Sequence, residues 1–134
     1  MPIVDSSPLP SDPDPLKVLV VEDESIVALD IENMLEAIGC KVVASVPRLI
    51  KALHLAGSLD IDLAVLDIHL AGELVYPLAL RLAERGIPFV FSTGYSTATL
   101  PPELRDRPLV RKPVTLGGLK KAVALARTGM RIVN

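Results

Sequence analysis

The stretch Leu16-Lys17-Val18-Leu19-Val20-Val21-Glu22-Asp23-Glu24, residues 16–24, is an apolar run that ends abruptly in three acidic residues. Only Lys17 interrupts its apolar part, so the run predicts a buried strand that leads into an acidic loop. From Ser25 to Ile38, apolar residues recur at helical spacing, and Gly39 stands where helix ends favour glycine. This part of the chain therefore predicts a strand followed by an amphipathic helix.

The same unit recurs along the rest of the chain. Further short apolar runs predict strands at 41–46, 62–66, 88–92 and 109–111. Helical spacing of apolar residues predicts helices over 47–56, 76–86 and 116–129, with a short or irregular one in the proline-containing segment 96–106. Strands that are continuous apolar runs are typical of a parallel sheet covered on both faces. We therefore expect an α/β fold, a doubly wound, flavodoxin-like (β/α)5 sheet of five parallel strands in the order 2-1-3-4-5.

The composition fits one compact domain. The chain has 134 residues, of which 50% are hydrophobic, and this is enough for one core but too few for two. Residues 1–15 hold five of the twelve prolines and no periodic apolar pattern, so we expect a flexible Pro-rich tail at 1–15 and a folded domain at 16–134. The single cysteine, Cys40, cannot form an internal disulfide, which fits a reducing compartment.

The charge pattern and the apolar pattern argue against two classes of binding partner. A net charge of −2, 3% aromatic residues and no basic cluster argue against direct binding of DNA or RNA. No apolar run approaches the roughly 20 residues of a membrane-spanning helix, and the N-terminus is Pro-rich and acidic, unlike a signal peptide. We therefore expect a cytoplasmic protein that binds neither nucleic acid nor membranes.

Polar residues stand directly after four of the predicted strands. Glu22 and Asp23 follow the first, Asp67 the third, Thr93 the fourth and Lys112 the fifth. In a doubly wound sheet, ligands bind at the carboxyl ends of the strands, so these side chains are expected to form one site. Close carboxylates raise one another's pKa and call for a cation, and an all-oxygen set selects a hard ion such as Mg²⁺. A carboxylate can also attack phosphorus, so the set suits phosphoryl transfer through an aspartyl-phosphate.

These residues, in this order and at these strand ends, resemble the receiver domain of two-component response regulators over about residues 16–128. The resemblance implies that Asp67 is the phosphoacceptor, that Lys112 pairs with the phosphoryl group and that Thr93 donates a hydrogen bond to it. It also implies a magnesium site, whose ligands are Glu22, Asp23, Asp67 and the backbone carbonyl of His69. For Glu24, the third acidic residue of the loop, we expect a helix cap and not a ligand.

A narrower match lies around the fourth strand. The stretch Pro88-Phe89-Val90-Phe91-Ser92-Thr93-Gly94-Tyr95 resembles the Phe-x-Thr-Gly-Tyr signature of a subgroup of single-domain response regulators, often called the FAT GUY group. Gly72-Glu73 followed by Tyr76-Pro77 is similar to that subgroup too. The resemblance implies that the phosphoryl donor is a sensor histidine kinase, of the HWE or a related type, or a histidine phosphotransfer protein.

One position departs from the receiver pattern. Most receivers carry an aromatic residue three positions before the lysine of the last strand, and here that residue is Leu109. The usual switch, in which the aromatic side chain follows the threonine hydroxyl, therefore cannot operate. Our hypothesis gives the readout to Tyr95, two residues after Thr93; the alternative is that Tyr95 only packs over the short fourth helix.

We expect a stand-alone receiver, because no output domain follows residue 134 in this sequence. Such a receiver is a phosphoacceptor that promotes its own phosphorylation and dephosphorylation, and it is not an enzyme with a separate substrate. Its output is either a changed contact with a downstream protein, on the face of the last strand and its flanking helices, or the draining of phosphoryl groups from a shared kinase.

Two other functions stay open at this point. A pseudo-receiver binds its partners without phosphorylation; Leu109 favours this function, whereas the complete acidic set, Thr93 and Lys112 oppose it. A haloacid-dehalogenase-type phosphatase also uses an aspartyl-phosphate and Mg²⁺. That enzyme needs an Asp-x-Asp motif, and Asp67-Ile68-His69 lacks the second aspartate.

Overall fold

The computed structural model of the chain describes residues 14–94 and 100–129. These residues build a central sheet of five parallel strands in the order β2-β1-β3-β6-β7. The strands are β1 (Lys17–Val21), β2 (Lys41–Val46), β3 (Leu63–Asp67), β6 (Phe89–Thr93) and β7 (Leu109–Arg111). They are the first to fifth strands of the predicted sheet, so the predicted order 2-1-3-4-5 is confirmed. Each predicted strand end lies within one residue of the observed end.

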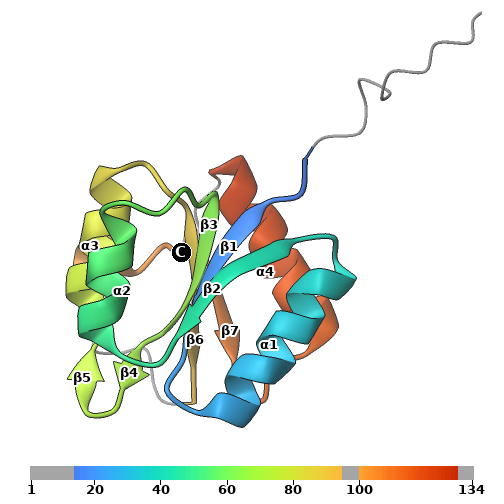
Figure 1. Cartoon of the computed structure of the whole chain (residues 1–134), viewed down its shortest axis with the longest axis horizontal. Helices are drawn as coiled ribbons and strands as arrows, with labels where there is room; N and C mark the ends of the chain where they lie inside the picture. The colour runs from blue at the N-terminus through green and yellow to red at the C-terminus, as the bar shows by residue number, and fades with distance from the viewer. Residues whose placement is uncertain (1–13, 95–99, 130–134) are drawn as a thin grey trace, which may run out of the picture.

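Among the described residues, four α-helices cover the sheet, two on each face (Figure 1). The helices α2 (Leu49–Ala56) and α3 (Tyr76–Glu84) pack together on one face, and α1 (Ser25–Ala37) and α4 (Leu116–Thr128) pack together on the other. Between β6 and β7 the described residues form one short 3₁₀ helix, η1 (Pro102–Leu104). This agrees with the short or irregular helix predicted there, although residues 95–99 lie outside the described residues.

Both faces of the sheet are buried, which explains why the strands are continuous apolar runs in the sequence. Alternate residues of β1 point to opposite faces: Val18 and Val20 pack with α1 and α4, whereas Leu19 and Val21 pack beneath α2 and α3. Every residue of β3 and β6 is buried. Full burial of one large aliphatic side chain contributes about 1.5–3 kcal/mol. The two apolar layers therefore hold the strand ends, and the polar residues attached to them, in fixed relative positions.

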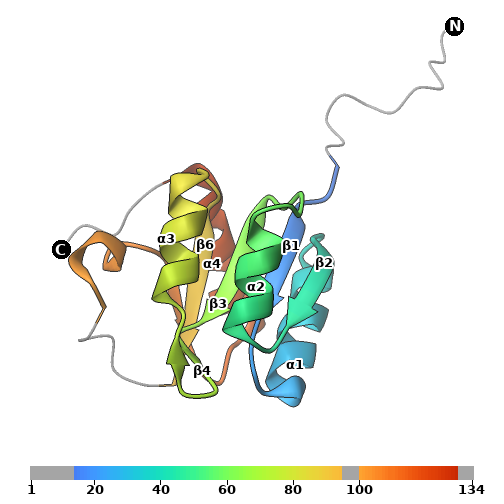
Figure 2. The ribbon, with the colours of Figure 1, turned by 60° about the vertical axis from the view of Figure 1, so that its left-hand side comes forward.

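The sequence does not predict the small hairpin between β3 and α3. The strands β4 (His69–Leu70) and β5 (Glu73–Leu74) pair antiparallel at the edge of the molecule where β3 ends (Figure 2). Ala71 and Gly72 join them with φ angles of 50° and 88°, the two positive values of a tight hairpin turn. Strands of two residues are too short to show an alternating pattern, so the sequence carries no strand signal here.

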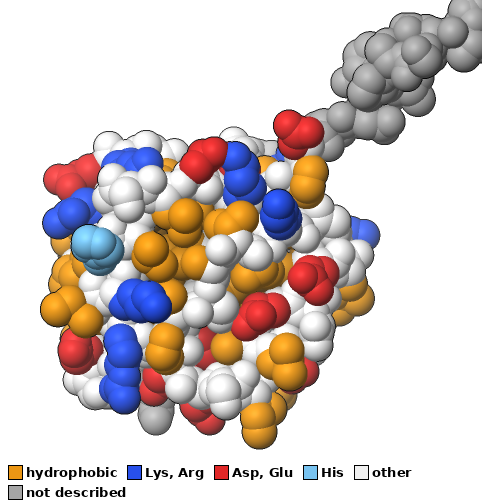
Figure 3. Space-filling model, in the orientation of Figure 1, with side chains coloured by type: hydrophobic (Ala, Val, Ile, Leu, Met, Phe, Trp, Pro, Cys, Tyr) orange, Lys and Arg blue, Asp and Glu red, His pale blue; other side chains and the backbone are white. Residues whose placement is uncertain are grey.

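Charges of both signs are interspersed among apolar side chains on the face drawn in Figure 3, without one basic patch. Cys40 is a free, partly buried thiol that packs against the apolar layer beneath α1 and α4. No helix in the described ranges is long and apolar enough to span a membrane. Of the predicted tail at 1–15, only Asp14 and Pro15 belong to the described residues.

Candidate functional site

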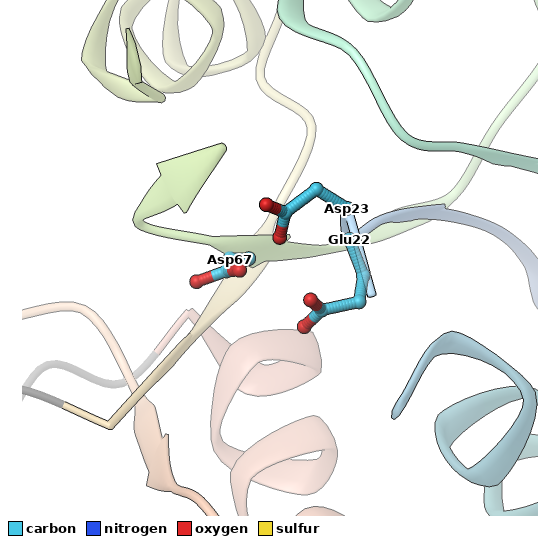
Figure 4. Close-up of side chains that lie close together, drawn as sticks. All are labelled: Glu22, Asp23 and Asp67. Atoms are coloured by element: carbon cyan, nitrogen blue, oxygen red, sulfur yellow. The ribbon is translucent and has the colours of Figure 1, made fainter. Parts of the chain in front are cut away.

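The carboxyl ends of the parallel strands meet at one edge of the sheet, and three acidic side chains gather there. Glu22 and Asp23 follow β1, and Asp67 ends the neighbouring strand β3. Each side chain offers one carboxylate oxygen, and these oxygens all lie within 4.8 Å of one another (Figure 4). Glu22 and Asp67 are buried, with exposed fractions of 2% and 5%, whereas Asp23 is partly exposed. The fold thus brings together three acids that are up to 45 residues apart in the sequence.

Lys112 lies beside two of these carboxylates. It directly follows β7, and its backbone N–H donates to the carbonyl of Thr93 at 2.9 Å, next to the paired part of β6 and β7. Its Nζ donates a hydrogen bond to Oδ2 of Asp67 at 3.2 Å and forms an ion pair with Oε1 of Glu22 at 2.9 Å. The Lys112 side chain is 19% exposed. The ammonium group is therefore mostly withdrawn from water and is held between two buried carboxylates.

Each of the three carboxylates also accepts a hydrogen bond from a backbone N–H group. The donors are Glu24 to Oε2 of Glu22 at 3.0 Å, His69 to Oδ1 of Asp67 at 3.2 Å, and Ala71 to Oδ2 of Asp23 at 2.9 Å. Hydrogen bonds of this kind are strong because the acceptor is charged. They limit the rotation of each carboxylate, so the three groups keep a common orientation toward the strand ends.

Burial is the largest influence on the pKa values of the site. It raises the pKa of Glu22 to about 7, although Lys112 and a backbone N–H oppose this. It also raises the pKa of Asp67, again against the effect of Lys112. For Asp23, burial alone raises the pKa, but the Ala71 N–H and neighbouring groups outweigh it, so the pKa is lowered. For Lys112, burial alone lowers the pKa, but Glu22 and Asp67 outweigh it, so the pKa is raised.

The donor set fits a hard divalent cation. Three carboxylates face one ammonium group, so the fully ionised cluster carries an excess of negative charge. Two of these carboxylates have raised pKa values, which means that their ionised forms are poorly stabilised by the protein alone. All three side-chain donors are oxygens, the ligands that Mg²⁺ prefers, and water completes such a shell. The residues present are therefore suited to Mg²⁺.

A depression of about 420 Å³ opens over the cluster. Its lining comes from the loop after β1, the end of β3, the β4–β5 hairpin and the residues that follow β6 and β7: Asp23, Glu24, Asp67, His69, Ala71, Gly72, Gly94 and Lys112. His69, predicted to contribute only its backbone carbonyl, thus lies at the site. The depression makes Asp67 reachable from solution even though the residue is largely buried.

Other predicted site residues lie near this edge or outside the described residues. Thr93 ends β6, is 1% exposed and follows Ser92, which is the register partner of Asp67. Leu109 begins β7 and is a partly buried residue packed against the core beneath α2 and α3. Tyr95, the predicted readout residue, lies outside the described residues.

Glu24 is the N-cap residue of α1, as the sequence predicts, but its side chain makes no capping hydrogen bond. The side chain is 68% exposed, and its Oε1 lies 4.0 Å from Nζ of Lys112. Glutamate is longer than the residues that cap efficiently, and the nearby ammonium group attracts it. A fourth acidic side chain therefore stands at the rim of the site.

Ala71 is the contributor to the site that sequence reasoning missed. It acts through a backbone N–H, so neither its side chain nor its spacing points to the site. The Ala71-Gly72 pair is a fair signal for a turn, since small residues adopt positive φ angles more readily. Nothing in that signal says that the turn reaches Asp23, which lies 48 residues earlier.

No family model matches the chain, but solved structures are similar to it in both sequence and fold. SdrG from Sphingomonas melonis Fr1 is 39% identical, with a TM-score of 0.75, and the match covers 84% of this chain and 97% of SdrG. The signal receiver domain of a modulated diguanylate cyclase from Desulfovibrio desulfuricans G20 is 26% identical, with a TM-score of 0.74; the match covers 87% of this chain and 96% of that domain. The chain belongs to the response-regulator receiver family.

Two further matches are similar to this receiver. The transcriptional regulatory protein PdtaR from Mycobacterium tuberculosis is 28% identical over 124 residues, which is 90% of this chain. The receiver spans only 60% of the length of PdtaR. A second structure of SdrG, in the BeF₃-activated conformation, is also 39% identical, with a TM-score of 0.72 and coverage of 83% of this chain and 95% of SdrG.

Proposed function

We propose that this receiver acts as a response regulator that accepts a phosphoryl group on Asp67 with Mg²⁺ bound. One observation carries the proposal. The Asp67 carboxylate lies in an open depression, close to two further carboxylates and 3.2 Å from Nζ of Lys112. A nucleophilic carboxylate, a set of acidic cation ligands and a fixed ammonium group are what phosphoryl transfer to aspartate requires.

The relatives add independent support. SdrG adopts a BeF₃-activated conformation, and beryllofluoride bound to a carboxylate is a chemical mimic of an acyl phosphate. The segment from Phe91 to Tyr95 matches the Phe-x-Thr-Gly-Tyr signature, which is why we place the chain in the FAT GUY subgroup within the family. We assign residues 16–134 to the receiver domain.

The proposed Mg²⁺ ligands are the carboxylates of Glu22, Asp23 and Asp67 and the backbone carbonyl of His69. When bound, the ion supplies positive charge that offsets the carboxylates and the oxygens of the incoming phosphoryl group. The fixed orientation of the three carboxylates means that little reorganisation accompanies binding. This is the role that the backbone donors of the site support.

In the transfer itself, a carboxylate oxygen of Asp67 attacks the phosphorus of a phosphohistidine. The O–P bond forms as the P–N bond breaks, and the electron pair of the P–N bond stays on the imidazole nitrogen. Lys112 then pairs with one phosphoryl oxygen, and the Thr93 hydroxyl donates a hydrogen bond to another. Later attack by water on the phosphorus releases inorganic phosphate and restores the carboxylate.

The donor in this proposal is a sensor histidine kinase, of the HWE or a related type, or a histidine phosphotransfer protein. The output is a contact with a downstream protein or the draining of phosphoryl groups from a shared kinase. A groove of about 450 Å³ between β7 and α4 supports the first output, since apolar residues of both elements line it together with Arg111 and Lys121. The protein acts in the cytoplasm, on protein partners and not on nucleic acid or membranes.

Tyr95 keeps its proposed role as the readout of phosphorylation, because Leu109 offers no aromatic ring on β7. Replacement by alanine is the direct test of this role. If Tyr95→Ala still changes its partner affinity on phosphorylation as the wild-type protein does, Tyr95 is not the readout.

The proposed function is tested by incubating the purified protein with Mg²⁺ and acetyl phosphate, or with a histidine kinase and labelled ATP. Intact mass is expected to show one added phosphoryl group, which chelation of Mg²⁺ prevents. Asp67→Asn is expected to abolish the adduct. Asp60→Asn is the matched control, because it makes the same chemical change at an exposed position that precedes β3 at the opposite edge of the sheet.

The contrary result is also informative. A folded protein that binds Mg²⁺ but takes no phosphoryl group from any of several donors contradicts the proposal and leaves the phosphorylation-independent pseudo-receiver. An adduct that persists in Asp67→Asn means that another residue is the acceptor.

A further inference from the structure

The β4–β5 hairpin reaches the acidic cluster through a single backbone group. The N–H of Ala71 donates to Oδ2 of Asp23 at 2.9 Å, and this contact joins two loops that are 48 residues apart. Both Ala71 and Gly72 line the depression over the cluster. The hairpin is therefore part of the wall of the site, although it contributes no charged side chain to the acidic cluster itself.

The conformation of the turn directs this N–H. His69 pairs with Leu74 and Leu70 with Glu73, which leaves Ala71 and Gly72 as the two-residue turn. Both have positive φ angles, 50° and 88°. A positive φ angle is unfavourable for residues with a Cβ atom. Gly72 has no Cβ atom and therefore adopts its positive φ angle without strain.

The base of the hairpin is anchored in the core. Ile68, Leu70 and Val75 are almost completely buried beneath α2 and α3. The N–H of Val75 donates to the carbonyl of Ile68 at 2.9 Å and closes the base. A hairpin held at its base and bent by a specific turn presents its N–H in one direction only.

We propose that the Ala71 N–H is a positioning group for the Mg²⁺ site, and that the Gly72 turn sets its direction. The inference rests on the proposed function, because it concerns the affinity of that same cluster for Mg²⁺. By holding Oδ2, the N–H fixes the Asp23 carboxylate and leaves Oδ1 available to a cation. Asp23 is the most exposed of the three acids, so it is the one that core packing restrains least.

The alternative is that the contact only satisfies a donor in the turn and does not affect the cation. The two roles predict different Mg²⁺ affinities when the contact between Ala71 and Asp23 is lost. Groups that orient a metal ligand typically change affinity about 10- to 100-fold when they are lost, whereas a turn with a structural role alone changes only stability.

The test is an NMR-detected Mg²⁺ titration of the full chain and three variants. Gly72→Val places a β-branched residue at a φ of 88°, and Gly39→Val makes the same change at a φ of 94° at the opposite edge of the sheet. A Cβ atom meets nothing within 4 Å at either position, so the Cβ itself causes no clash and both variants share the backbone strain of a positive φ angle. Gly72→Asn is the conservative variant, because asparagine tolerates positive φ angles.

We expect Gly72→Val to bind Mg²⁺ about tenfold more weakly, with Gly39→Val and Gly72→Asn within about twofold of the wild-type protein. The amide proton of Ala71 is expected to move upfield in Gly72→Val only, as its hydrogen bond weakens. If Gly72→Val does not fold, Gly72→Ala and Gly39→Ala repeat the comparison with about a threefold difference in affinity expected.

Wild-type affinity in Gly72→Val, with the Ala71 resonance shifted, overturns the inference and leaves the proposed function intact. Equal weakening in Gly39→Val also overturns it, because the effect is then one of global stability. A wild-type protein that binds no Mg²⁺ overturns the proposed function, and the inference with it.

Discussion

The two edges of the sheet hold similar charged pairs in different surroundings. At the amino edge, Lys17 pairs with Asp60, and the two side chains are 38% and 80% exposed. At the carboxyl edge, Lys112 pairs with Glu22 and Asp67, whose side chains are 1% and 6% exposed. Water screens the first pair, whereas the second cluster depends on its own members for stabilisation. The two edges therefore differ in the burial of charge and not in its presence.

Removal of the two lysines is the strongest test of this comparison. Lys112→Met leaves two buried carboxylates without their cation, so we expect the free energy of unfolding without Mg²⁺ to fall by about 3–5 kcal/mol near neutral pH. Lys17→Met is expected to match the wild-type protein within error, because its partner is hydrated. Urea unfolding followed by circular dichroism measures both variants. Equal losses of stability in the two variants mean that burial does not distinguish the two edges.

The pH dependence of stability is the next largest effect. The pKa of Glu22 is raised from 4.5 to about 7, so folding favours its protonated form. Its contribution is an added instability that is absent below about pH 4.5, grows as pH rises and is complete above about pH 7. Glu22→Gln removes this trend. In chelator, we expect its free energy of unfolding, relative to that of the wild-type protein, to rise by about 3 kcal/mol between these limits.

Asp23→Asn is the contrasting variant for this pH series. The pKa of Asp23 is lowered, so its carboxylate contributes stability that is present above 3.8 and is lost as pH falls through the lower folded value. The difference in stability between Asp23→Asn and the wild-type protein is therefore expected to be constant above pH 3.8 and to change only as the pH falls below that value. If both variants change stability over the same pH range, burial does not distinguish the two acids.

Mg²⁺ is expected to have a smaller effect on stability. At a concentration about ten times its Kd, a ligand of the folded state adds about 1.4 kcal/mol to the free energy of unfolding. Asp23→Asn is expected to lose most of this gain, because it removes one of the cluster's charges. Asp60→Asn is expected to keep it, since Asp60 lies at the amino edge. Urea unfolding in Mg²⁺ and in chelator gives the difference for each variant, and an equal gain in Asp23→Asn contradicts the assignment of the ligands.

The order of the strands and the grouping of the acids can be predicted for one physical reason. A parallel sheet buried on both faces requires apolar runs, so residues such as Val18 to Val21 mark a strand clearly. The same parallel arrangement places the carboxyl ends of all strands at one edge. Once the strands are located, Glu22, Asp67 and Lys112 must lie near one another.

The β4–β5 hairpin and the contacts of Ala71 and Glu24 could not be predicted from apolar runs and strand ends. The β4–β5 hairpin has too few residues to show a pattern, and the role of Ala71 belongs to an N–H that every residue except proline carries. The side chain of Glu24 turns toward Lys112 and does not cap α1, because the lysine arrives from a strand 88 residues away. The contacts of Ala71 and Glu24 follow from an approach of distant segments, which local sequence does not encode.

The smallest expected effect is the dependence of stability on salt concentration. It tests whether the charged pair at the amino edge is exposed to water. Lys17 pairs with Asp60 at this edge, and the pairing raises the pKa of Lys17. At about 1 M salt the screening length falls to about 3 Å, and any difference between Lys17→Met and the wild-type protein is expected to vanish. The loss in Lys112→Met is expected to persist at the same salt concentration, because the low exposure of Glu22 and Asp67 limits screening by dissolved salt. A Lys17→Met difference that survives high salt means that the amino edge is protected from water as well, and burial then no longer distinguishes the two edges.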